Sequence, residues 1–94
     1  MVVHFYATFR PIVGGKTVEV PLAEGATVAQ VLEHLFDRYP ELRAQMMDGQ
    51  GNLLPYVHCF VNGRDVHYLP EGLQTPLRLE DRLDIFPPVG GGCI

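Results

Sequence analysis

The sequence has no tryptophan, only two cysteines and no long apolar run. A membrane-spanning helix needs about 20 consecutive apolar residues, and no stretch of this chain approaches that length. The N-terminus also lacks the charged and then apolar pattern of a secretory signal. We therefore expect a cytoplasmic protein with no membrane partner. In a reducing cytosol, disulfides are disfavoured, so we expect Cys59 and Cys93 to be free thiols.

Basic residues are also scarce. Seven lysines and arginines against eleven acidic residues give a formal net charge of -4, with no basic run. Nucleic acids and anionic membranes require clustered lysine and arginine, so the composition predicts no nucleic-acid partner.

Residue patterns that would indicate an enzyme are missing as well. The four histidines, His4, His34, His58 and His67, have no familiar metal-binding spacing, and the loop 48–52 lacks the remaining ligands of a calcium loop. Gly90–Gly92 is followed by neither a lysine nor a helix, unlike a phosphate-binding loop. No nucleophile is paired with a base. Glu80 and Asp81, next to two arginines, are typical of a solvated sheet edge. The chain is therefore predicted to be no enzyme and to bind no metal or cofactor itself.

The 94 residues, 47% of them hydrophobic, suffice for one compact core. Residues 2–10 alternate between two faces and predict a strand with Val3, Phe5, Ala7 and Phe9 facing inward. A turn at 13–16 leads to a second predicted strand, 17–22, which together with the first makes a hairpin. Its inward residues are Val18, Val20 and Leu22.

The next segment has a helical period. Thr27 is the expected N-cap, with Gln30 completing a capping box, and Pro40 is expected to end the helix. Its apolar stripe consists of Val28, Val31, Leu32, Leu35, Phe36 and Tyr39. The opposite face is polar and carries Gln30, Glu33, Asp37 and Arg38. A helix with one apolar stripe is expected to lie on one face of a sheet.

The second half of the sequence predicts further strands. Residues 56–61 form one of them, followed by an Asn62–Gly63 hairpin turn into residues 64–66. Residues 70–76 are expected to cross irregularly, and 79–86 to form the last strand, which Pro87–Pro88 ends. A hairpin, one helix and further strands predict an α+β fold with a mixed sheet.

The two-residue period also assigns side chains to faces. Cys59 falls on the inward side and is predicted to be a small buried apolar residue rather than a sulfur relay. Tyr6, Phe60 and Phe86 fall on the sheet face opposite the helix. Exposed aromatic residues that cluster on one face are candidate anchors for a partner protein.

The sequence ends with three glycines, Gly90–Gly92, before Cys93–Ile94. Glycines bury no side chain and lose the most conformational freedom on ordering, so fold stability does not favour them here. A chain without Cβ atoms is thin enough to enter a narrow channel in a second protein. The ending therefore indicates a function in a partner's active site.

Three sequence features identify the chain as a member of the MoaD/ThiS family of ubiquitin-like sulfur carriers. They are Val61-Asn62-Gly63, the run from Leu83 through Phe86-Pro87-Pro88-Val89, and the glycines. The resemblance implies a β-grasp domain over residues 1–86, with a mixed four- to five-stranded sheet and one main helix on one face. It also implies a flexible tail over 87–94.

In that family a partner enzyme adenylates the terminal glycine carboxylate, using ATP and magnesium, and the carboxylate becomes a thiocarboxylate. The resemblance assigns the sulfur to Gly92 and recognition by partners to Val89, Gly90 and Gly91. It implies four kinds of partner: an adenylating enzyme like ThiF or MoeB, a sulfur donor (a sulfurtransferase or sulfide), a sulfur-accepting biosynthetic enzyme and, for some relatives, a peptidase.

The peptidase follows from Cys93 and Ile94, which extend beyond the family's glycine ending. The chain resembles the carrier of a thioquinolobactin siderophore pathway, in which a zinc-dependent JAMM-type peptidase removes a similar dipeptide. A second route is attack of the Cys93 thiol on the Gly92 carbonyl.

Three functions stay open at this point. A sulfur carrier loses Cys93–Ile94 and gains a thiocarboxylate, and a ubiquitin-like modifier forms an isopeptide bond through Gly92. An inert-tailed interaction domain tolerates changes to Gly92. A role like the small subunit of molybdopterin synthase is a further alternative, although those relatives usually end at the glycines. The final sulfur acceptor, whether a siderophore, cysteine or another metabolite, is determined by the partner.

Overall fold

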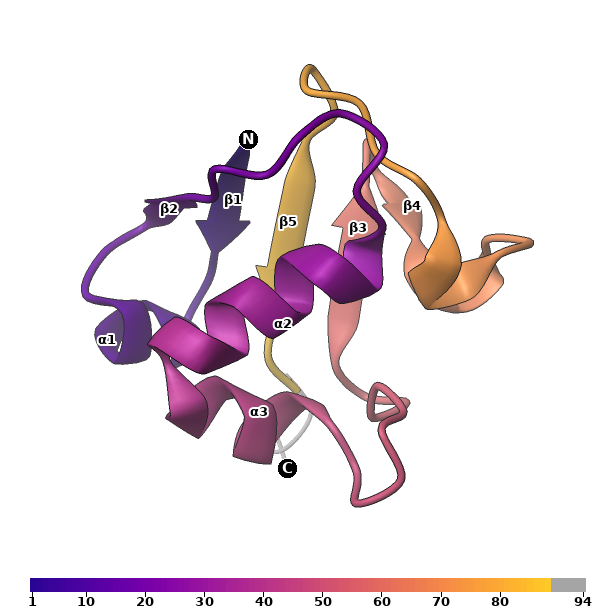
Figure 1. The fold of residues 1–94 in the computed structure, drawn as a ribbon. Coiled ribbons are helices and arrows are strands. Elements are labelled where there is room, and N and C mark those ends of the chain that lie inside the picture. The colour runs from indigo at the N-terminus through magenta and orange to yellow at the C-terminus, as the bar shows by residue number, and fades with distance from the viewer. Residues whose placement is uncertain (89–94) are drawn as a thin grey trace.

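The computed structural model describes residues 1–88 of the chain. Five strands form one mixed sheet in the order β2-β1-β5-β3-β4, and helix α2 lies across one face of it (Figure 1). The strands are β1 (Val2–Phe5), β2 (Thr17–Glu19), β3 (His58–Val61), β4 (Arg64–Asp65) and β5 (Leu83–Phe86). Strands β1 and β5 pair in parallel, while the other three pairings are antiparallel. The predicted α+β fold is confirmed, with five strands.

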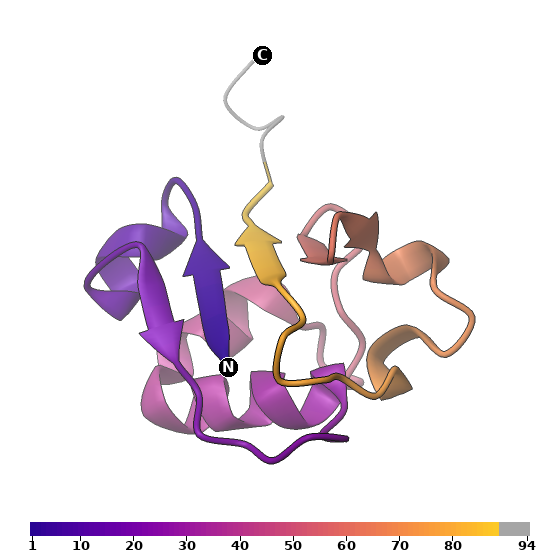
Figure 2. The same ribbon diagram turned by 90° about the horizontal axis from the view of Figure 1, so that it is seen from above.

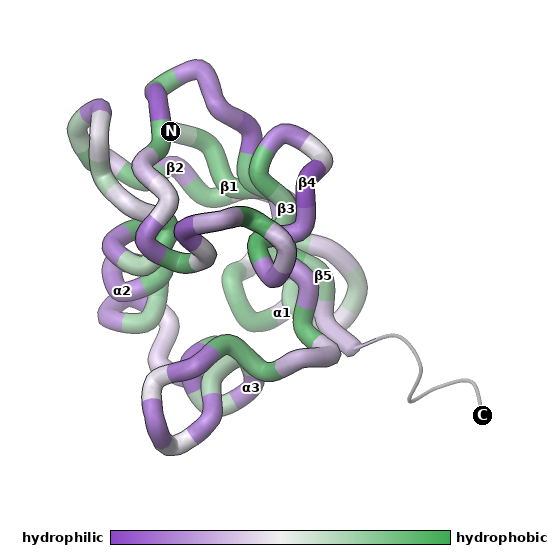
Figure 3. Tube along the Cα trace, turned by 90° about the vertical axis from the view of Figure 1, so that its right-hand side faces the viewer, coloured by the Kyte–Doolittle hydropathy of each residue, from purple (hydrophilic) through white to green (hydrophobic). Residues whose placement is uncertain are grey.

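Helix α2 (Val28–Arg38) begins as the sequence predicts. The Thr27 hydroxyl accepts a hydrogen bond from the Gln30 N–H, and the Gln30 side chain accepts one from the Thr27 N–H. This reciprocal capping box satisfies two N–H groups that a helix start otherwise leaves unpaired. Purple and green alternate along the tube of α2 in Figure 3, as expected for a helix with one apolar stripe. The stripe residues Val28 to Phe36 are buried, and Tyr39 is half-buried.

Pro40 ends α2 but also begins a helix that the sequence analysis did not predict. Helix α3 (Pro40–Met46) has this proline in its first turn. Proline suits that position because the N–H it lacks would have no partner there. Leu42 and Met46 of α3 are buried in the core, so the helix adds a second element to the face covered by α2.

The first predicted strand is too long. Strand β1 ends at Phe5, Ala7 has a φ of 51°, and the chain turns into a short helix α1 (Phe9–Val13). Left-handed backbone cannot continue a strand, so Ala7 is exposed rather than inward. Phe9 is buried as predicted, but from a helix. Gly14 then ends α1 with a φ of 81°.

The other strands are shorter than predicted at their outer ends. Residues 20–22, 56–57, 66 and 79–82 lie outside the strands. Of the residues predicted to face inward from the second strand, Val18 and Val20 are buried and Leu22 is half-buried. The Asn62–Gly63 turn is confirmed, with φ values of 52° and 84°. Two successive positive φ values match the twist of a two-residue hairpin. The crossing contains two short 3-10 helices, η1 (Val66–Tyr68) and η2 (Gly72–Gln74).

Cys59 is buried in the core between the sheet and the helices, as predicted. Burial, together with the negative charges of Asp65 and Asp84, raises the pKa of its thiol to about 12. Only the thiolate reacts readily with alkylating agents. The position and the pKa of Cys59 both favour a packing role over a sulfur relay.

We expect Cys59 to resist alkylation in the folded chain. In a Cys93→Ala variant, iodoacetamide at pH 8 should leave the mass unchanged, and should add one label after unfolding in urea. Rapid labelling of the native variant would contradict a closed core at Cys59.

None of the helices in residues 1–88 combines the length and the apolar character needed to cross a bilayer.

Candidate functional site

The centre of the sheet leads into the C-terminal segment. Strand β5 lies between β1 and β3, and it ends at Phe86, just before Pro87 and Pro88 (Figure 2). Proline cannot donate to a strand ladder, so two successive prolines end the pairing here. The last described residues therefore follow the central strand of the sheet, next to the side chains of the face that α2 does not cover.

Three aromatic side chains gather on that face, and we call them the aromatic patch: Tyr6, Phe60 and Phe86. The rings of Tyr6 and Phe86 are stacked with centroids 4.1 Å apart, and Phe60 meets Phe86 edge-on at 5.5 Å. Offset stacking and edge-on contacts are the favoured geometries of aromatic pairs. All three side chains are half-buried. The predicted gathering of these residues opposite α2 is therefore confirmed.

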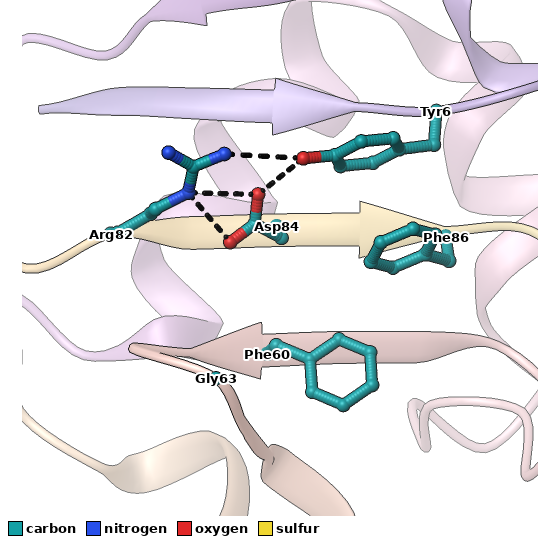
Figure 4. Close-up of a pocket in the computed structure, with 6 residues that line it drawn as sticks. All are labelled: Tyr6, Phe60, Gly63, Arg82, Asp84 and Phe86. Atoms are coloured by element: carbon teal, nitrogen blue, oxygen red, sulfur yellow. Dashed lines mark hydrogen bonds and ion pairs between the residues drawn. The ribbon is translucent and has the colours of Figure 1, made fainter.

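The aromatic patch borders an open groove of about 370 Å³. Figure 4 shows the residues that line it: Tyr6, Phe60, Gly63, Arg82, Asp84 and Phe86. Gly63 closes one side without a side chain, because the hairpin turn requires its positive φ. The groove thus combines an apolar wall with one ion pair.

That ion pair belongs to a hydrogen-bond network the sequence analysis did not find. The Tyr6 hydroxyl donates to Asp84 Oδ1 at 2.7 Å, and Arg82 Nε donates to both carboxylate oxygens at 3.1 and 3.0 Å. Arg82 Nη2 also donates to the Tyr6 hydroxyl at 3.2 Å. Arg82 and Asp84 are two residues apart in an extended chain, so they share a face. The signal in the sequence that could have indicated this network is the charged Asp84 between two apolar strand residues, Leu83 and Ile85.

The network keeps Asp84 ionised although only 8% of the residue is exposed. Burial alone would raise its pKa. The hydrogen bonds from Arg82 and Tyr6, with the positive charge of Arg82, outweigh burial and lower the pKa of Asp84 below its ordinary 3.8. The same contacts raise the pKa of Arg82. Both groups are therefore charged at neutral pH.

Replacing Asp84 with asparagine should destabilise the fold by about 2 kcal/mol at pH 7, because charge-assisted hydrogen bonds are lost. Since the folded-state pKa is lowered, this stabilisation is present above pH 3.8 and is lost as the pH falls through the lower, folded-state pKa. Urea unfolding from pH 7 to pH 2.5 should show the two chains converging. Asp37→Asn, on the exposed face of α2, is the matched control. A constant difference across this range would contradict the ionic contribution.

The other end of the aromatic patch carries a histidine–aspartate pair. His58 Nδ1 lies 2.8 Å from Asp65 Oδ2, and the His58 ring stacks near Phe60 at 6.0 Å. The Asp65 carboxylate also accepts from the His67 N–H, and His67 Nε2 lies 3.0 Å from the Val57 carbonyl. Burial opposes ionisation of Asp65, but these hydrogen bonds and histidines lower its pKa. His58 and His67 therefore have structural partners.

A group of side chains suited to bind a metal is not found in the described part of the chain. Within residues 1–88, no three histidine, cysteine, aspartate or glutamate side chains are grouped as metal ligands. Asp81 accepts hydrogen bonds from the Arg78 N–H and the Asn62 side chain, so it stabilises a turn. The remaining predicted site residues, Val89, Gly90, Gly91, Gly92, Cys93 and Ile94, lie outside the described residues.

Comparison with known proteins places this geometry in a family. A model described as the ThiS family matches residues 3–92. Small archaeal modifier protein 3 of Haloferax volcanii is 39% identical over 88 residues, 94% of each chain.

Two solved structures have the same fold. The structure of small archaeal modifier protein 1 from Haloferax volcanii superposes with a TM-score of 0.81 at 27% identity, covering 97% of both chains. The BexX/CysO complex of Amycolatopsis orientalis contains a chain with a TM-score of 0.78 at 30% identity, covering 97% of this chain and 98% of that one. The expected ubiquitin-like β-grasp is therefore confirmed. The chain belongs to the ThiS family of small ubiquitin-like sulfur carriers and modifiers.

Proposed function

We propose that the chain is a sulfur carrier that works through the carboxylate of Gly92. The observation that carries the proposal is the position of the aromatic patch. It lies beside the end of β5, from which the chain continues toward the glycines. A partner that docks on the patch holds the root of the glycine segment next to its own active site. The residues after Pro88 then have to be only long enough, and narrow enough, to reach a nucleotide bound in that active site.

The chemistry proceeds in three steps. A JAMM-type zinc peptidase adds water across the Gly92–Cys93 peptide bond, which frees the Gly92 carboxylate and releases the residues from Cys93 onward. An activating enzyme like ThiF or MoeB then catalyses attack of a carboxylate oxygen on the α-phosphorus of ATP, and pyrophosphate leaves. In the third step hydrosulfide attacks the acyl carbon and AMP departs, leaving a thiocarboxylate.

In this scheme the carrier supplies position and the partner supplies catalysis. ATP and magnesium bind to the activating enzyme. The carrier contributes the aromatic patch and an acyl group without a neighbouring Cβ. Its thiocarboxylate donates sulfur to a biosynthetic enzyme, whose substrate determines the product.

Conjugation to proteins is a second candidate function. The 39% identity to a small archaeal modifier protein over nearly the whole chain favours it. The same acyl adenylate then reacts with a lysine Nζ rather than with sulfur, giving an isopeptide bond and AMP. The two functions share every step up to the adenylate, so the nucleophile separates them.

Intact mass distinguishes these outcomes. The chain is co-expressed with the JAMM-type peptidase and the activating enzyme encoded in the same genome, then purified with and without reductant. We expect loss of Cys93–Ile94 and exchange of one oxygen for sulfur. Adducts with other proteins through Gly92 would favour the modifier. An uncut, unmodified chain beside partners shown to be active would contradict both.

A further inference from the structure

Two arginines border the aromatic patch, and each is held through its Nε atom. Arg10, on α1, donates from Nε to the Phe5 carbonyl at 2.9 Å, and its Cζ lies 5.3 Å from the centroid of the Tyr6 ring. Arg82, just before β5, donates from Nε to the Asp84 carboxylate. An Nε bond fixes the plane of a guanidinium but leaves its terminal N–H groups available.

The two guanidinium groups approach Tyr6 from different directions. Arg10 lies over the ring, and Arg82 donates to the hydroxyl at 3.2 Å. Phe86 stacks on the same ring and extends the aromatic patch toward Phe60. The apolar surface therefore has a fixed positive charge on the α1 side and another at the end of the groove where the chain enters β5.

Terminal donors of both arginines remain unused. Within residues 1–88, neither terminal nitrogen of Arg10 donates a hydrogen bond, and neither does Nη1 of Arg82. By contrast, every carboxylate oxygen of Asp84 and Asp65 already accepts one. Around the groove, terminal donors of the two arginines are therefore unused within residues 1–88, whereas the carboxylates of Asp84 and Asp65 are occupied. A guanidinium with free terminal N–H groups matches a carboxylate, which accepts two parallel bonds.

The net charge of the whole chain limits the kind of partner that these two arginines can attract. The chain has a formal net charge of -4, so its overall field does not attract a polyanion. An apolar centre bordered by two fixed cationic groups fits a protein surface of matching size. Charged groups at the border of an interface orient the partners and increase the rate of association.

We propose that the partner surface covering the aromatic patch carries an apolar anchor with carboxylates on two sides, one paired with Arg10 and one with Arg82. This inference rests on the proposed function and names the chemistry of its partner, the activating enzyme. The carboxylates determine which face of the enzyme receives the carrier. The aromatic rings supply the apolar contact.

The test uses ATP–pyrophosphate exchange by the activating enzyme of the same genome, with carrier chains that end at Gly92. Arg10→Gln and Arg82→Gln should each raise KM for the carrier about tenfold, and the double variant about a hundredfold, with kcat unchanged. Rising salt should raise the KM of the unaltered chain more than that of the double variant. Arg38→Gln, an equal charge change on α2, should stay within about twofold of the unaltered chain.

A second variant separates docking from folding. Arg82→Gln removes donors from Asp84, so thermal unfolding of each chain is measured alongside the kinetics. Arg82→Lys keeps the positive charge but loses the paired N–H donors of the planar guanidinium. This variant should raise KM less than Arg82→Gln does. Within residues 1–88, Arg10 donates a hydrogen bond only to a backbone carbonyl, so its variant tests the inference without removing a donor from Asp84.

Two results would overturn the inference in different ways. If the double variant keeps the KM of the unaltered chain while Phe86→Asp abolishes exchange, the patch docks without carboxylate pairing and only this inference fails. If the unaltered chain supports no exchange with an enzyme active on another carrier, the proposed function fails and this inference fails with it.

Discussion

Replacing Phe86 with aspartate should lower kcat/KM for adenylation of the carrier about a hundredfold or more. The Phe86 ring links the other two aromatics, stacking on Tyr6 at 4.1 Å and meeting Phe60 at 5.5 Å. A central aromatic of an interface often contributes more than 2 kcal/mol to binding. An aspartate there removes this contact and adds a charge that docking has to desolvate. The loss should appear mainly in KM.

The fold should tolerate this change. The inward side chains of β5, Leu83 and Ile85, remain in the core, and Phe86 is only half-buried. Circular dichroism and thermal unfolding check that the variant is native. Tyr68→Asp is the matched control, since Tyr68 is an 87% exposed aromatic outside the patch. Adenylation that is unchanged in folded Phe86→Asp would show that the activating enzyme docks elsewhere.

A conservative variant of the same residue separates the effect of losing the aromatic ring from the effect of adding a charge. Phe86→Leu keeps an apolar side chain but loses the aromatic stack on Tyr6. Aromatic pairs contribute about 0.5–1.5 kcal/mol beyond the area they bury. We therefore expect a loss of only about tenfold or less in kcat/KM.

The parts of the fold that the sequence predicted are those with a strong local pattern. Thr27 with Gln30, and Asn62 with Gly63, determine backbone geometry through side-chain chemistry or positive φ, and both are found as predicted. The alternation in β3 and β5 placed Phe60 and Phe86 on one face correctly. A period of two assigns faces even when the strand limits are inaccurate.

The errors arise where the local pattern is ambiguous. Alternation continues from Val3 to Phe9, yet the positive φ of Ala7 turns the chain and Phe9 reaches the core from a helix. Pro40 both ends one helix and begins another, since proline suits a first helical turn. Whether a helix follows a proline depends on the tertiary contacts of residues such as Leu42 and Met46.

Only part of the candidate site could be predicted from the sequence, because local patterns place side chains on a face but do not show long-range contacts. Its aromatic side chains lie on strands, where parity assigns the face. The hydrogen bonds from Tyr6 to Asp84 and from Arg82 to Tyr6 join residues more than 70 positions apart. Arg10 is also absent from the predicted site, because the predicted strand extended over its helix. Long-range polar contacts require the register of β1 on β5, which no local pattern supplies.

A chain that ends at Gly92 should form the thiocarboxylate with the activating enzyme and a sulfide donor alone, whereas the chain that continues to Ile94 should need the peptidase as well. Until the Gly92–Cys93 bond is hydrolysed, Gly92 has an amide rather than a carboxylate, and an amide cannot attack ATP in the proposed way. The expected difference is all or none. Intact mass after a single incubation with ATP, magnesium and sulfide measures it.

Substitutions at the end of the chain make this prediction specific. Gly92→Val adds a branched side chain next to the reacting carbonyl, so both cleavage and adenylation should fall below detection if the partner's channel admits only a chain without Cβ atoms. Cys93→Ser removes the thiol but keeps the peptide bond. The peptidase should cut this variant normally, whereas a route through attack of the Cys93 thiol on Gly92 requires the sulfur. Thiocarboxylate on the uncut chain, or release of Cys93 without the peptidase, would contradict proteolytic activation. Full activity of Gly92→Val would show instead that the partner does not recognise the glycines.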